Sequence, residues 1–208
     1  WEGGSEPRAG GAVPVPAPQT EMVRLDGKPS VSILLGQPTG LRYRDADTLA
    51  LRVGTAILGQ GFTGRLMSSV RDREGLTYGI GAAISDDTYA EGAFGISASF
   101  APQLLEQGIG STRRELQRWW ADGVSAEELA RRKQSLIGSY QVGLSSTGGI
   151  AAALLATAQR GLDLAWLDRY PQMVRALSPE QVNGAIRKHL DPSRMTLVEV
   201  GTLGAHAP

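Results

Sequence analysis

Two stretches near the middle of the chain alternate apolar with small residues, and they constrain the fold more than any other feature. In residues 92–100, Phe94, Ile96 and Phe100 lie two or four positions apart. A period of two is typical of a strand with one buried face. Residues 77–85 predict a second strand, and the intervening DDTYAE supplies turn residues. The pair therefore predicts an antiparallel hairpin in a sheet with one buried face.

Helical periodicity and capping signals occupy most of the remaining chain. Ser125 with Glu128 forms a capping box, and the sequence SPEQ opens another helix at residue 178. The first expected helix begins at Asp45 or Asp47, and further helices are expected over residues 63–71, 105–123, 125–141, 145–161, 164–177 and 178–190. Two further strands are expected over residues 31–35 and 195–200. This order predicts an α+β fold, in which helices cover a mainly antiparallel sheet.

The first residues differ in composition from the rest of the chain. Residues 1–20 contain several prolines and almost no large side chains, so they cannot bury enough surface to offset ordering. We interpret them as a flexible linker, followed by one domain over residues 21–208. The chain begins at Trp1 without a signal peptide, so we expect a fragment or a processed product.

Composition excludes several classes of protein. The 21 basic residues balance 21 acidic residues, so no net charge attracts nucleic acid. The absence of cysteine excludes disulfides, thiolate ligands and a cysteine nucleophile. The longest apolar run, residues 150–158, is about half the length of a membrane-spanning helix. A chain without cysteine suits a periplasmic or secreted protein, although a cytoplasmic location stays open.

Common catalytic motifs are missing. His189 is expected in the last turn of a helix, where it suits the helix dipole, and His206 lies in the tail. Without a second histidine on one helical face, this chain is not expected to bind zinc or another cofactor by itself. The Gly-rich segments GLSSTGG and GQGFTG lack the P-loop lysine, so we interpret both as turns that enter helices. No GxSxG elbow supports a serine hydrolase.

The most informative stretch is residues 64–81, GRLMSSVRDREGLTYGIG. Arg71 is expected near the end of a short helix, Gly75 permits a turn with positive φ, and Tyr78 enters the next strand. A guanidinium and a phenol aimed at one point are two donors for a carbonyl or an oxyanion. The alternative is structural. Arg71 could be an ordinary solvated charge, and Tyr78 could pack across strands with Ile80 and its neighbours.

The same stretch resembles the C-terminal half of insulinase/pitrilysin-type zinc peptidases, the inverzincins. Their segment has the form RLxxxVRxxxGLxY, and here it is RLMSSVRDREGLTY. The likeness continues through AEELARRKQSLIGSYQ to MTLVEVGT and covers about residues 21–203. It implies one of two homologous halves that close around a peptide. The zinc-free half carries an arginine and a tyrosine seven residues apart, which Arg71 and Tyr78 match as substrate-binding residues.

The resemblance implies that an N-terminal half or partner subunit with an HxxEH motif supplies zinc and the general base. The chain is then the substrate-binding part of a peptidase and is expected to be inactive alone. One alternative is a non-catalytic scaffold or partner subunit with the same fold, since the family includes such subunits. Another is an unrelated α+β binding domain. An HxxEH motif encoded upstream of Trp1 would support only the first interpretation.

Overall fold

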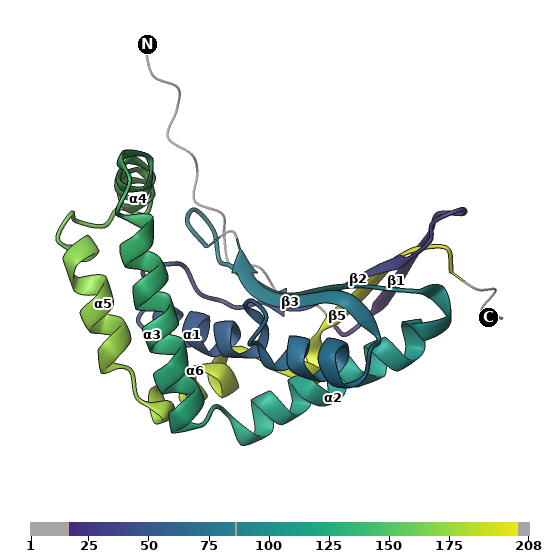
Figure 1. Cartoon of the computed structure of the whole chain (residues 1–208). Coiled ribbons are helices and arrows are strands. Elements are labelled where there is room, and N and C mark those ends of the chain that lie inside the picture. Colours follow the sequence, from purple (N-terminus) through teal and green to yellow (C-terminus); the bar gives the residue numbers. More distant parts are fainter. Residues whose placement is uncertain (1–16, 86, 204–208) are drawn as a thin grey trace, which may run out of the picture.

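The computed structural model describes residues 17–85 and 87–203, which form one five-stranded sheet with helices packed on it (Figure 1). The strands are β1 (Thr20–Arg24), β2 (Val31–Pro38), β3 (Thr77–Ser85), β4 (Ala93–Phe100) and β5 (Thr196–Gly201). Their order is β1–β5–β2–β4–β3. Neighbours pair antiparallel, except that β1 and β5 are parallel. β3 is therefore an edge strand.

One face of the sheet is covered by helices and the other is open. Figure 1 shows α1, α2 and α6 below the sheet. These helices are α1 (Thr48–Gly59), α2 (Leu105–Asp122) and α6 (Pro179–His189). Trp119 of α2 is fully buried, and its ring stacks on that of Phe94 in β4 with 6.0 Å between the ring centroids. Its Nε1–H donates to the Gly54 carbonyl of α1 at 3.1 Å. One residue thus joins two helices to the sheet in the core.

Three further helices extend from one end of this layer. They are α3 (Ala126–Gly143), α4 (Thr147–Gln159) and α5 (Trp166–Ala176). Tyr140 of α3 contacts the Tyr170 ring of α5 at 4.6 Å and donates to the Leu167 carbonyl at 2.9 Å. Figure 1 shows α4 at the tip of this group. α4 lies on the same side of the sheet as its open face, away from α1, α2 and α6.

The structure confirms the predicted fold class and most of the predicted elements. The hairpin of β3 and β4 is antiparallel, and Ser125 and Ser178 both form complete capping boxes. Gly123 ends α2 with a φ of 77°. These features were predictable because caps and strand alternation are local signals.

Two elements differ from the prediction. The segment expected as an ordinary helix over residues 63–71 instead contains a π-helix, η1 (Met67–Arg73). Its wide turn is seen in the hydrogen bond from the Glu74 N–H to the Ser69 carbonyl, five residues back, at 3.1 Å. β1 was not predicted, because all of its residues are exposed and no alternation marks it. The expected linker over residues 1–20 lies mostly outside the described residues, although its last residue begins β1.

Two short 3₁₀ turns complete the fold. They are η2 (Pro102–Leu104) and η3 (Pro192–Arg194), and they precede α2 and β5. Within the part of the chain that the structure describes, no helix is both long enough and apolar enough to cross a membrane.

Candidate functional site

Arg71 lies in the wide turn of η1, close to the edge of the sheet. π-turns are rare and occur often at functional sites. Here the Ser69 hydroxyl donates to the Arg65 carbonyl at 2.8 Å, a side-chain bond that competes with the regular backbone ladder. Gly75 then reverses the chain with a φ of 64°. The Arg71 side chain keeps 31% of its surface exposed, and its nearest ion-pair partner among the described residues is Asp72, at 3.9 Å.

Tyr78 points out of the protein because β3 contains an irregularity at that point. Thr77 and Ile80 are both buried, and the pairing with β4 shifts register between them. The Thr77 hydroxyl donates to the Ser99 carbonyl at 2.6 Å and accepts from the Gly79 N–H at 3.2 Å, so it replaces part of the ladder. The extra residue changes the phase of the strand. Tyr78 is therefore 90% exposed, which contradicts the alternative in which it packs across strands.

A third side chain, Phe62, completes the group. Phe62 belongs to the loop GQGFTG and is 76% exposed. The Arg71 guanidinium carbon lies 5.6 Å from the Phe62 ring centroid and 5.4 Å from the Tyr78 ring centroid. Both distances fall within the range of cation–π contacts. The structure therefore brings the two predicted residues together and adds an aromatic residue that sequence reasoning missed.

The loop that carries Phe62 is fixed by backbone packing. Gly59 lies so close to β3 that an added Cβ would come within 2.2 Å of the Ala82 nitrogen. Gly61 has a φ of 71°, a conformation that favours glycine. Arg132 of α3 is 9% exposed and donates to the Gln60 carbonyl at 3.0 Å, and its burial lowers the pKa of its guanidinium. These contacts hold the loop against both β3 and α3.

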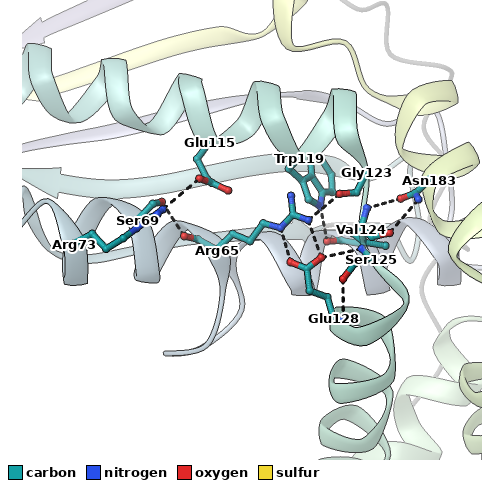
Figure 2. Close-up of polar contacts among 11 residues, drawn as sticks. Arg65, Ser69, Arg73, Glu115, Trp119, Gly123, Val124, Ser125, Glu128 and Asn183 are labelled. Carbon is teal, nitrogen blue, oxygen red and sulfur yellow. Dashed lines mark hydrogen bonds and ion pairs between the residues drawn. The ribbon is translucent and has the colours of Figure 1, made fainter.

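Arg65 anchors the other end of the same loop (Figure 2). Its guanidinium donates to both carboxylate oxygens of Glu128, at 2.7 and 2.8 Å, and to the Gly123 carbonyl at 2.8 Å. The hydrogen bond from Arg65 is the main cause that lowers the pKa of Glu128 from an ordinary 4.5 to about 2. Glu128 also accepts from the Ser125 N–H at 2.8 Å. One carboxylate thus caps α3 and holds the start of η1.

A groove with a volume of about 720 Å³ adjoins the loop. It crosses the open face where neighbouring strands carry small residues, since Gly95 lies opposite both Gly36 and Ala83. Gly61, next to Phe62, lines the groove as well. One loop therefore borders the groove through Gly61 and contacts Arg71 through Phe62.

The described residues contain no group of three or more His, Cys, Asp or Glu side chains that could hold a metal ion. His189, the last residue of α6, lies with its Nε2 2.9 Å from Oδ2 of Asp47, the residue that precedes α1. That contact, together with a hydrogen bond from Lys188, lowers the pKa of the Asp47 carboxyl. His206 lies outside the described residues. The described residues therefore offer no set of ligands that fits a zinc ion.

The domain thus combines an open sheet face with a contact between Arg71 and Tyr78, and its described residues contain no metal-ligand cluster. The sequence profile described as peptidase M16 inactive domain matches residues 2–136. The chain therefore belongs to the peptidase M16 inactive-domain family, and the resemblance seen in RLMSSVRDREGLTY is confirmed at that level.

Individual relatives agree with the family. An uncharacterized zinc protease of Streptomyces coelicolor is 27% identical over 203 residues, which are 95% of this chain and 42% of that protein. A peptidase M16 inactive domain from Pseudomonas fluorescens superposes with a TM-score of 0.83 at 29% identity and covers 93% of this chain and 45% of that chain. A Helicobacter pylori protease shares the fold, with a TM-score of 0.80 at 19% identity over 88% of this chain and 44% of that one. The chain thus spans less than half the length of these relatives.

Proposed function

We propose that this chain is the substrate-binding half of a zinc metallopeptidase, and that Arg71 and Tyr78 bind the peptide next to the bond that is cleaved. The observation that carries the proposal is the exposed Arg71–Tyr78 contact at the edge of the sheet. The pair places two solvent-accessible donors at that edge, since Tyr78 is exposed and Arg71 is partly exposed. A pure scaffold would have no use for the pair.

The two side chains have complementary chemistry. A guanidinium offers up to five N–H donors in a planar fork, and a phenol offers one O–H donor. Donors placed before the reaction stabilise an oxyanion without reorganisation, which is how such groups lower a barrier. The contact with two aromatic rings limits the rotation of the Arg71 side chain. We therefore assign to Arg71 and Tyr78 the binding of the substrate carbonyl as negative charge develops on it.

The neighbouring edge strand offers a way to bind the backbone of the substrate. β3 pairs with β4 on one side only within the described residues. An extended peptide could add to the other side through main-chain hydrogen bonds, and such binding selects for length and shape more than for sequence. Ala83 and Ser85 are exposed on β3 beyond Tyr78, so small side chains leave the strand accessible.

The other half of the peptidase, on the same polypeptide or on a separate subunit, is proposed to carry HxxEH and to bind the zinc. Zinc supplies an activated water for attack on the peptide bond when it is bound there. A periplasmic or secreted location is also proposed, on the absence of cysteine. Fractionation of cells that produce the complete protein would test the location.

The proposal is tested with Tyr78→Phe in the complete two-half protein. The change removes one donor and keeps the ring, so we expect peptide hydrolysis to fall about a hundredfold, roughly 3 kcal/mol of transition-state stabilisation. Zinc content and melting temperature should stay at wild-type values, because Tyr78 is exposed and bonds to no buried group in the described structure. Activity within twofold of wild type would refute the assigned role of Tyr78.

A further inference from the structure

Helix α4 is unusually apolar for its exposure. Its sequence, TGGIAAALLATAQ, contains no charged residue. Ile150, Leu154 and Leu155 keep 44%, 38% and 60% of their surfaces exposed, and Thr157 is the one buried residue of the helix. A surface helix of a soluble protein normally has one apolar stripe facing the core and charged residues on the opposite side. α4 lacks both the buried stripe and the charged side.

The segments on either side of α4 also carry exposed apolar residues. Val142, near the end of α3, is 73% exposed, and Leu164, between α4 and α5, is 65% exposed. We call Val142, Ile150, Leu154, Leu155 and Leu164 the α4 patch. An apolar surface of this kind on an otherwise well-packed domain marks a site of contact with another molecule or domain.

We propose that the α4 patch is a docking surface for the other half of the peptidase, a proposal that rests on the proposed function above. Two of the relatives, from Streptomyces coelicolor and Pseudomonas fluorescens, are more than twice as long as this chain, which covers 42% of the first and 45% of the second. A second homologous half is therefore the part of the protein that is available to cover the patch. Its contacting surface must itself be apolar, because α4 offers no charge and few free polar groups.

The position of α4 gives the docked half a defined place. Figure 1 shows α4 on the side toward which the open sheet face looks, opposite α1, α2 and α6. A half that rests on α4 therefore also faces the sheet, with its groove of about 720 Å³. The chamber for the peptide would lie between the two halves, and α4 would act as the contact at one end of it. This arrangement protects the patch without covering the groove.

The test uses the absence of cysteine from this chain. Single variants Leu155→Cys and Gln117→Cys are made in the complete protein and labelled with a maleimide, and peptide mass spectrometry measures the rate at each site. Gln117 is exposed on α2, one of the helices that cover the other face of the sheet, and serves as the control. We expect Leu155→Cys to react at least about tenfold more slowly than Gln117→Cys, because thiol reactivity follows exposure.

Each outcome decides the proposal. Equal labelling rates at the two sites, in a protein that holds zinc and cleaves peptide, would overturn the docking surface and leave the proposed function intact. Protection that disappears on dilution while activity per molecule persists would assign the patch to a second copy and overturn the proposal. Protection that appears only with vesicles of anionic phospholipid would also overturn it. Slow labelling in a protein without zinc or activity would support docking and refute the proposed function.

Discussion

Arg65 and Arg71 lie six residues apart in the same segment, and the fold uses them in opposite ways. Arg65 is held by both carboxylate oxygens of Glu128 and by the Gly123 carbonyl. Arg71 has no carboxylate partner closer than 3.9 Å among the described residues and lies within cation–π distance of two exposed rings. The comparison shows that residue type and segment do not determine a role. The role depends on whether the donors of a guanidinium are already occupied by the fold.

The largest effect on stability is expected from Arg65→Ala. The change leaves the Glu128 carboxylate, only 21% exposed, without its main partner, which should lower the free energy of unfolding by about 3 kcal/mol. Urea denaturation of the 208-residue chain measures the loss. The control is Arg131→Ala, which removes an exposed pair with Glu127 and should cost less than about 1 kcal/mol. Similar losses in the two variants would show that the Arg65 contacts carry no special stability.

Arg71→Ala should give the opposite pattern. Peptide hydrolysis by the complete protein should fall about a hundredfold, because a charged donor to the developing oxyanion is lost. The urea midpoint should change little, because the nearest carboxylate, on Asp72, is exposed and distant. A large loss of stability with unchanged activity would reverse the comparison and assign Arg71 a structural role.

A smaller, pH-dependent effect is expected from Glu128→Gln. The charge-assisted bonds to Arg65 should contribute about 2 kcal/mol at neutral pH. Because folding lowers the pKa of Glu128 from 4.5 to about 2, the unfolded chain takes up the proton first. The stabilisation is therefore complete above pH 4.5 and is lost as the pH falls toward 2. Melting curves of wild type and Glu128→Gln should converge over that window, and a constant difference across it would contradict the assignment.

Most of the fold could be predicted from the sequence, because its signals are local. The alternation around Phe94 and the capping boxes at Ser125 and Ser178 need only neighbouring residues to be recognised. β1 could not be predicted, because it pairs with β5 from the far end of the chain and buries none of its residues. Its existence depends on a partner that is 177 residues away in sequence, since Thr20 pairs with Leu197.

The site was only partly predictable. Spacing and resemblance predicted Arg71 and Tyr78 as a pair, and the structure brings them together, but the direction of Tyr78 depends on the irregularity at Thr77, which a simple period of two misses. Phe62 was missed because GQGFTG was interpreted only as a turn that enters a helix. A large aromatic residue between glycines, with no apolar neighbours to form a core, is the signal that could have identified it.

The smallest effect tests that missed residue. Phe62→Leu keeps an apolar side chain but removes the ring beside Arg71, and a cation–π contact at an exposed position contributes about 0.5–1 kcal/mol. If the ring only limits the motion of Arg71, hydrolysis by the complete protein should fall about two- to fivefold. Phe62→Tyr retains a ring and should stay near wild type. In an Arg71→Ala background the Phe62→Leu change should have no further effect, because the ring then has no guanidinium to hold. An undiminished effect in that background would mean that Phe62 contacts the peptide independently of Arg71.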